Sequence, residues 1–182
     1  MRALGVVFAV GWAAFWIYWI LAAFSTTRGR VSWRREVFIR VVIVAVVIVL
    51  VHFGAFRNDG TNTNAWRAAL GLVLFALGLA LAIWARVYLG RNWGMPMTRK
   101  QEPELVTHGP YRLVRHPIYS GILLAGAGTA VALDLTWLLA VGLVAIYFVY
   151  SATVEERLLT EQFPDAYPAY KRSTKMLVPF VL

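Results

Sequence analysis

One short segment concentrates side chains that can bind and orient a charged ligand. It reads LVTHGPYRLVRHPIYSG from residue 105 to residue 121 and contains two tyrosines, two arginines and a histidine: Tyr111, Tyr119, Arg112, Arg115 and His116. Pro117 opens the apolar run that follows, and proline suits the first position of a helix because no N–H is needed there. His116 then caps a helix start, whose free N–H groups and partial positive charge favour a carboxylate or phosphate. We therefore expect a small-molecule site at a membrane surface.

An acidic pair, Glu155 and Glu156, is expected to reach the same place. Two apolar runs separate this pair from the predicted helix start: 117–133 and 135–154. At ~1.5 Å per residue these runs form helices of roughly 26 and 30 Å, so they make a hairpin with nearly matched arms. The hairpin would return both glutamates to Arg115 and His116. The residues alone leave an alternative open, in which the glutamates are ordinary juxtamembrane charges and Arg115 meets lipid phosphate.

The composition indicates an integral membrane protein. Of the 182 residues, 60% are hydrophobic and 15% are charged, which is too apolar for a soluble domain of this size. The chain has no cysteine, so thiolate metal sites, iron–sulfur clusters and cysteine nucleophiles are excluded. Its formal charge of +9 does not indicate nucleic-acid binding, because the basic residues lie in short loops beside apolar runs.

Runs of about twenty apolar residues predict the architecture. We expect a single all-α membrane domain, 1–182, that forms a helical bundle of about five transmembrane helices: 3–24, 37–56, 66–88, 117–133 and 135–154. A loop (90–116) and a tail with an amphipathic interfacial helix (155–182) would lie at one membrane face. The first run exceeds the ~7 to 15 apolar residues of a signal peptide and precedes a cluster of arginines, so we interpret it as a span.

Small and aromatic residues predict which helix faces pack together. The third span has small residues that permit close helix approach: Gly71, Ala76, Gly78, Ala80 and Ala82. The fourth span has a small-residue face for its hairpin partner: Gly121, Ala125, Gly126 and Gly128. Three tryptophans of the first span share one face and either pack on a neighbouring helix or line a lipid-tail groove: Trp12, Trp16 and Trp19.

The distribution of basic residues predicts the orientation in the membrane. With five spans, the segments 25–40, 86–115 and 157–175 lie on one side and hold 15 of the 18 lysines and arginines. Because basic loops stay in the cytoplasm, we expect the 90–116 loop and the C-terminus to be cytoplasmic and the N-terminus external. A reporter fused to the C-terminus tests this orientation, and a signal from outside the cell alone would contradict it.

The expected crevice suits a zwitterion that also carries a flat ring. An arginine or the helix start would hold the anion, a glutamate the cation, and apolar side chains the ring; S-adenosyl-L-methionine has all three features. Other chemistry is not supported. His108 and His116, with carboxylates that are distant in the sequence, do not make a convincing set of metal ligands, and no G-x-S-x-G, Walker A or Rossmann glycine motif occurs. His52 is ionisable and intramembrane, but a hydrogen bond to a backbone carbonyl explains it more simply.

The chain resembles the superfamily of isoprenylcysteine carboxyl methyltransferases and phospholipid methyltransferases, which are integral membrane enzymes. The resemblance covers about the C-terminal half and rests on four pieces: LGRNW at 89–93, the segment 105–121, the acidic pair, and the tail from Phe163 through Tyr167 and Tyr170 to the VPF of 178–180. It implies methyl transfer from S-adenosyl-L-methionine to a lipophilic acceptor, with S-adenosyl-L-homocysteine as the product.

The resemblance also implies roles for individual residues. Leu105 and Val106 would line the adenine pocket, with Tyr111 beside the cofactor. The methionine portion would be contacted by His116, Pro117, Ile118, Tyr119 and, from the other arm, Glu155. Arg115 would orient the site or face the acceptor, and Glu156 is the best-placed proton acceptor if the methylated group is an amine or hydroxyl.

The acceptor itself remains open at this point. The prenylcysteine enzymes of the superfamily carry an arginine just upstream of the acidic pair, and Ser151 stands there in this chain by ungapped alignment. We therefore keep three alternatives: a methyltransferase for a lipid-linked or small lipophilic acceptor, a phospholipid amine N-methyltransferase, and a non-catalytic membrane sensor or assembly protein.

Overall fold

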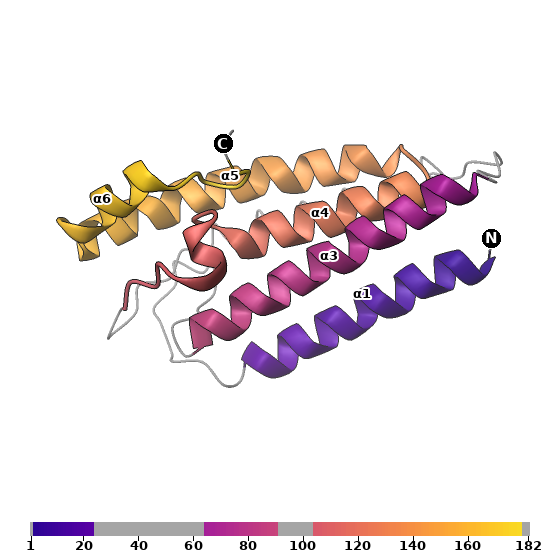
Figure 1. Cartoon of the computed structure of the whole chain (residues 1–182), viewed down its shortest axis with the longest axis horizontal. Helices are drawn as coiled ribbons and strands as arrows, with labels where there is room; N and C mark the ends of the chain where they lie inside the picture. Colours follow the sequence, from indigo (N-terminus) through magenta and orange to yellow (C-terminus); the bar gives the residue numbers. More distant parts are fainter. Residues whose placement is uncertain (1, 24–63, 91–103, 180–182) are drawn as a thin grey trace, which may run out of the picture.

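The computed structural model describes residues 2–23, 64–90 and 104–179, and within them it is almost entirely helical. Its elements are α1 (Arg2–Ala23), α3 (Ala65–Leu89), the short 3-10 helix η2 (Gly109–Arg112), α4 (Pro117–Ala132), α5 (Trp137–Gln162) and α6 (Ala166–Ser173) (Figure 1). The predicted span 37–56, His52 and part of the 90–116 loop lie outside the described residues. The described part contains no strand, only one bridge between Val114 and Lys175, so the all-α prediction is confirmed.

Three described helices are long and apolar enough to cross a membrane: Ala3–Ala22, Ala65–Leu89 and Trp137–Gln162. The fourth predicted span is a shorter apolar helix, α4, of 16 residues. At ~1.5 Å per residue it is roughly 24 Å long, less than the ~30 Å of a hydrocarbon core. The predicted boundaries of the first, third and fourth spans agree with the helices to within a few residues.

The fifth span differs from its prediction at its C-terminal end. We expected it to end at residue 154, but α5 continues for two further turns to Gln162. No residue after Val154 breaks a helix until Pro164, which disfavours helical geometry at Phe163. Glu155 and Glu156 therefore stand on a rigid helix and not at the start of the tail. The predicted helix of the tail is α6, which follows two residues after Pro164.

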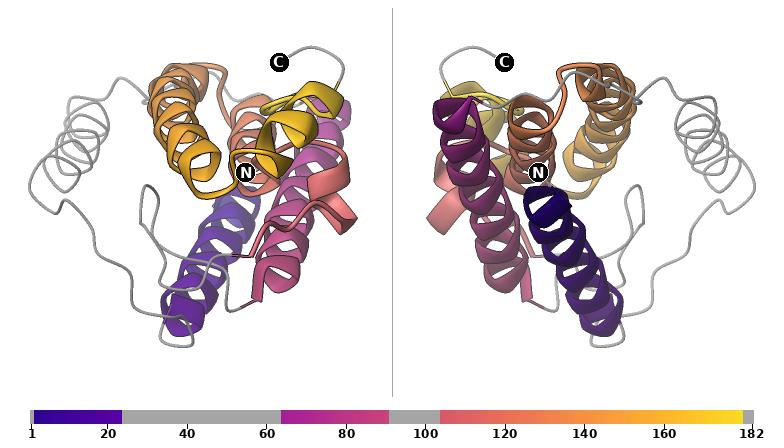
Figure 2. Two further views of the ribbon diagram at one scale, coloured as in Figure 1. Left: turned by 90° about the vertical axis from the view of Figure 1, so that its left-hand side faces the viewer. Right: turned by 90° about the vertical axis from the view of Figure 1, so that its right-hand side faces the viewer.

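The residues of the candidate site lie at one end of the helical bundle. The C-terminal ends of α1, α3 and α5 and the N-terminal end of α4 lie together at the left of Figure 1. In the views of Figure 2, α4 lies between α3 and α5. Thus α1 and α3 run parallel, and α4 runs against both α3 and α5.

Backbone contact between glycines joins α3 to α4. A Cβ atom placed on Gly78 would lie 2.5 Å from the carbonyl oxygen of Gly121, and one on Gly71 would lie 2.5 Å from that of Gly128. The converse Cβ positions are equally crowded, at 2.6 Å. Small residues at this contact therefore let the two backbones touch, as predicted for helices in membranes.

The partner of the small-residue face on α4 was predicted wrongly. We expected this face to meet the other arm of the hairpin, α5, but Gly121, Ala125 and Gly128 meet α3. Only Gly126 faces α5, where its Cβ position lies 3.0 Å from a methyl group of Val141. The glycines repeat every seven residues on each helix. This spacing suits packing on any antiparallel helix, so it does not indicate whether the partner of α4 is α3 or α5.

The helix α1 packs on this pair through aromatic side chains. Phe8 and Trp12 contact Phe75 of α3 edge to face, with ring centroids 4.8 and 5.5 Å apart. Trp12 also donates a hydrogen bond to Thr129 of α4, at 3.2 Å. Trp16 is 47% exposed, so the predicted tryptophan face is divided between helix packing and the outer surface.

A glycine substitution tests the contact between α3 and α4. Replacing Gly78 by alanine inserts a methyl group against the backbone of α4, which we expect to lower the free energy of unfolding by about 1–3 kcal/mol. The matched control is Gly142→Ala on α5, because nothing lies within 4 Å of the Cβ position of Gly142. Both changes favour the helix intrinsically. Thermal unfolding in detergent should separate the variants, and equal midpoints would contradict the packing described here.

Candidate active site

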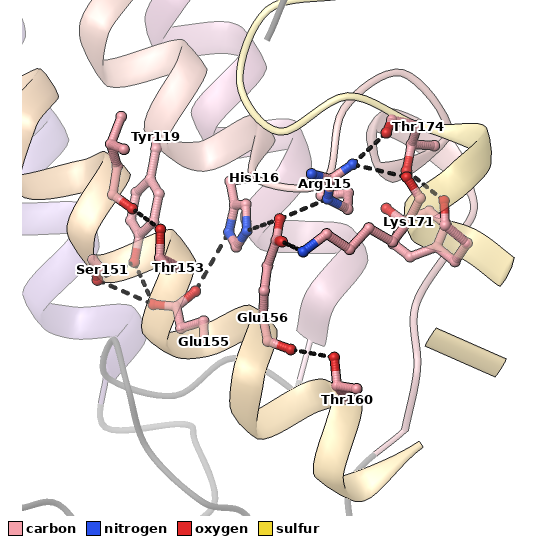
Figure 3. Close-up of polar contacts among 12 residues, drawn as sticks. Arg115, His116, Tyr119, Ser151, Thr153, Glu155, Glu156, Thr160, Lys171 and Thr174 are labelled. Atoms are coloured by element: carbon pink, nitrogen blue, oxygen red, sulfur yellow. Dashed lines mark hydrogen bonds and ion pairs between the residues drawn. The ribbon is translucent and has the colours of Figure 1, made fainter. Parts of the chain in front are cut away.

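The hairpin of α4 and α5 brings the acidic pair to the start of α4. Arg115 Nε lies 2.6 Å from Glu156 Oε1, and His116 Nδ1 lies 3.4 Å from Glu155 Oε2 (Figure 3). The other imidazole nitrogen, Nε2, lies 3.5 Å from Glu156 Oε1. The approach of the two glutamates to Arg115 and His116, predicted from the arm lengths, is therefore confirmed.

Local sequence explains how α4 begins at this position. Gly109 has a φ of 61°, which a residue with a side chain rarely adopts, and a Cβ there would clash with the ring of Tyr88. Pro117 occupies the first turn of α4 and His116 its N-cap position, as predicted. The His116 side chain makes no capping hydrogen bond; its carbonyl accepts from Ser120 instead. The imidazole is thereby left to face the glutamates.

Neutral hydroxyl groups surround Glu155. Its Oε1 accepts hydrogen bonds from Tyr119, at 2.5 Å, and from Ser151, at 3.3 Å, and these two hydroxyls lie 3.0 Å apart. The Tyr119 ring stacks on Phe148, with centroids 4.4 Å apart, and on His116 at 5.5 Å. The Glu155 side chain is 23% exposed and that of Glu156 only 3%. Of the two carboxylates, Glu155 is the one that a ligand can reach.

Cations surround Glu156. Besides Arg115, it pairs with Lys171 of α6, whose Nζ lies 2.6 Å from Oε2. These charges compensate a carboxylate that is almost completely buried. A carboxylate stabilised by two cations is a weak proton acceptor. The arrangement thus favours a positioning role for Glu156 over the proton transfer considered from the sequence.

His116 lies between the carboxylates of Glu155 and Glu156, and these two groups favour its protonated form. Burial alone would lower the pKa of His116, but the hydrogen bonds and charges of Glu155 and Glu156 outweigh this and raise the pKa above its ordinary value. The imidazolium therefore strengthens the site at pH values below this raised pKa, and its contribution is lost as the pH rises through it.

Two of the residues expected around adenine lie in an adjacent apolar cluster. Val106 and Tyr111 are buried with Ala85 of α3, and Ile118 packs against this cluster and also against that of Tyr119. Pro117 is fully buried and Leu105 half-buried. The structure thus divides the predicted residues into a polar network and a neighbouring apolar cluster, with Ile118 between them.

The C-terminal segment contributes contacts that sequence reasoning did not find. Backbone N–H groups of Arg115 and His116 donate to the carbonyls of Lys175 and Met176, at 2.8 and 3.0 Å. The Arg115 guanidinium also donates to the carbonyl of Thr174. These acceptors are backbone atoms, which leave no mark on the side-chain pattern. Ser151 and Lys171 were likewise not predicted to enter the polar network.

A buried arginine joins the C-terminal ends of two helices. Arg86 near the end of α3 donates to the carbonyl of Gly90, at 2.9 Å, and to that of Ala22 in α1, at 2.8 Å. We had treated Arg86 only as one of the charges that orient the protein in the membrane. Its position within an apolar run was the signal for a structural role, because arginine in a span needs partners.

Comparisons with known proteins find a matching family and several relatives. The family model described as phospholipid methyltransferase matches residues 66–166. The chain is 34% identical to the cobalt-zinc-cadmium resistance protein CzcN of Cupriavidus metallidurans, over 84% of this chain and 65% of the relative. It is 31% identical to protein-S-isoprenylcysteine O-methyltransferase B of Arabidopsis thaliana, over 67% of this chain and 64% of the relative. The chain thus spans less than two thirds of the length of these relatives.

A solved structure has the same fold. It is the eukaryotic intramembrane Ras methyltransferase ICMT (isoprenylcysteine carboxyl methyltransferase), with a TM-score of 0.61 and 23% identity, over 84% of this chain and 55% of the other. The match confirms the membrane helical fold.

The described residues contain no group of three or more His, Cys, Asp or Glu that could hold a metal ion.

The ion pair of Arg115 can be tested against a neighbouring arginine. Arg115→Gln leaves the buried Glu156 with one cation fewer, and we expect a loss of about 3 kcal/mol in the free energy of unfolding, as for other broken buried pairs. Arg112→Gln removes the same charge from an exposed side chain in η2 and should change stability little. Thermal unfolding in detergent compares the two variants. Similar losses would show that the ion pair with Glu156 contributes no more to stability than the exposed Arg112 does.

Proposed function

The chain belongs to the phospholipid methyltransferase family, whose model matches more than half of its residues, and on this premise we propose that it is an S-adenosyl-L-methionine-dependent methyltransferase for a lipophilic acceptor. The observation that carries the proposal is the accessible carboxylate of Glu155 beside the stacked rings of His116 and Tyr119. A carboxylate that is accessible in otherwise buried surroundings favours a cation such as a sulfonium or ammonium group.

The residues present fit this cofactor. Glu155, His116, Pro117, Ile118 and Tyr119 would hold its methionine portion, because they surround the polar network at the start of α4. The adjacent apolar cluster, with Val106 and Tyr111, would take the adenine ring together with Leu105. Ile118 packs against both clusters, which supports one continuous binding surface for a ligand with a charged end and a flat ring.

The protein's part in the reaction is positioning. The bound cofactor supplies a methyl group activated by the sulfonium. Glu155 is oriented by Tyr119, Ser151 and His116, and Arg115 with Glu156 fixes the start of α4. Holding reactants in near-attack geometry is worth about 7–11 kcal/mol in favourable cases. A carboxylate or thiolate acceptor would need no base, and for an amine or hydroxyl Glu156 would have to leave its ion pairs.

The position of the site favours an acceptor that comes from the membrane. The aromatic stack extends from His116 to Phe148, which lies in the membrane-spanning helix α5. An aliphatic tail that approaches between helices would meet apolar surroundings, and its reactive head would reach the polar network. This end of the bundle would face the cytoplasm, in line with the distribution of basic residues.

Cofactor binding tests the proposal directly. Calorimetry with the detergent-purified protein and S-adenosyl-L-homocysteine should give binding for the wild type and for Arg112→Gln, which alters an exposed arginine. His116→Ala and Glu155→Ala should each abolish it, because they remove the imidazole and the accessible carboxylate. Binding that survives both substitutions would rule out the site described here, and a wild type without affinity would favour the sensor or assembly alternative.

The acceptor class can be identified by a labelling experiment in membranes. Membranes that contain the protein are incubated with methyl-labelled cofactor, and the lipid extract is separated. Label in base-labile esters indicates a carboxyl acceptor such as an isoprenylcysteine, and label in phosphatidylethanolamine derivatives indicates the phospholipid amine alternative. Membranes with Glu155→Ala provide the background.

A further inference from the structure

A lysine outside the predicted site contacts its most buried carboxylate. Lys171 lies on α6, where its side chain is 50% exposed, and its Nζ reaches Glu156 Oε2 at 2.6 Å. The next residue, Arg172, is also exposed, and its side chain has no ion pair with the described residues. Two adjacent cations of α6 thus differ in one respect, namely the contact with Glu156.

The two oxygens of Glu156 serve different partners. Oε1 faces Arg115 Nε at 2.6 Å and His116 Nε2 at 3.5 Å, while Oε2 faces Lys171 (Figure 3). Because carboxylate and guanidinium readily form two parallel hydrogen bonds, a free Oε2 would draw the carboxylate towards a bidentate pair with Arg115. Lys171 opposes this rotation by occupying Oε2.

Lys171 is also tied to Arg115 through the backbone. The Arg115 guanidinium donates to the carbonyl of Lys171 at 3.2 Å, and the hydroxyl of Tyr170 donates to the carbonyl of Tyr111 at 2.6 Å. The C-terminal half of α6 is therefore not free to carry the ammonium group away from Glu156. These contacts fix the geometry in which Lys171, Glu156 and Arg115 meet.

We propose that Lys171 is a positioning residue of the site. By holding Oε2 of Glu156, it keeps Oε1 for Arg115 and His116, and so maintains the imidazole in the orientation in which its Nδ1 faces Glu155. Lys171 would act through Glu156 and His116, without touching the cofactor. The inference rests on the proposed function, because cofactor affinity is one of its readouts.

The charge of Lys171 has a second consequence, at His116. The groups that face this imidazole are Glu155 and Glu156 of α5 and Tyr119 of α4, with Arg115 adjacent in the chain. Without the ammonium group at Oε2, the carboxylate would turn towards a bidentate pair with Arg115, and its Oε1 would leave His116 Nε2, so the imidazolium loses stabilisation. The titration of His116 should then move to lower pH. A purely structural role of Lys171 would lower the melting temperature without a shift, and loss of the charge without a rotation of Glu156 would move the titration to higher pH.

Three variants test the proposal: Lys171→Met, Lys171→Arg and Arg172→Met. A pair with one half-exposed partner is worth up to about 1 kcal/mol, so Lys171→Met should weaken S-adenosyl-L-homocysteine binding by about fivefold in calorimetry. Lys171→Arg keeps the charge and should restore most of the affinity, and Arg172→Met should bind like the wild type. In NMR spectra of protein with labelled histidine, only Lys171→Met should move the His116 titration to lower pH, and a shift to higher pH would contradict the positioning role.

The outcomes separate this inference from the proposed function. If Lys171→Met binds and titrates like the wild type, or if Arg172→Met has the same effects, Lys171 has no positioning role. If the wild type itself does not bind S-adenosyl-L-homocysteine, the proposed function fails. The histidine titration then still decides whether Lys171 controls Glu156 and His116.

Discussion

The need to compensate the charge of one buried carboxylate determines how the hairpin, the loop before it and the tail meet. Glu156 is almost entirely removed from water, and an ionised carboxylate in such a place is costly unless cations and hydrogen bonds surround it. Its partners come from two other parts of the chain: Arg115 and His116 at the start of α4, and Lys171 on α6. The hairpin, the loop and the tail are thereby held in one arrangement, in which Glu155 stays accessible beside a histidine and a tyrosine.

The glycine contact between α3 and α4 complements this network from within the membrane. Polar contacts at the site hold the first turn of α4 in place, and close backbone packing holds the rest of the helix against α3. Because α4 lies between α3 and α5, the acidic residues of α5 and the apolar cluster at the end of α3 are held on the two sides of its first turn. The candidate site therefore depends on helix packing several turns away.

The sequence predicts those parts of this arrangement that depend on the lengths of apolar runs and on the chemistry of individual residues. Two apolar runs of similar length had to return Glu155 and Glu156 to His116, and proline and glycine marked the start of α4. Other features depended on choices that periodicity does not encode. Seven-residue glycine spacing did not distinguish α3 from α5 as the partner of α4. The backbone carbonyls of 174–176 and the pairing of Lys171, and not Arg172, with Glu156 arise only from the tertiary path of the tail.

Arg86 has a consequence for the parallel packing of α1 and α3. Helices that run side by side in the same direction align their macrodipoles, and the resulting repulsion is strongest where the surroundings are apolar and like ends meet. The guanidinium of Arg86 offsets this repulsion for both helices, since it donates to the carbonyl of Ala22 near the end of α1 and to that of Gly90 directly after α3. A single cation thus acts as a shared C-terminal cap for two helices that run in the same direction.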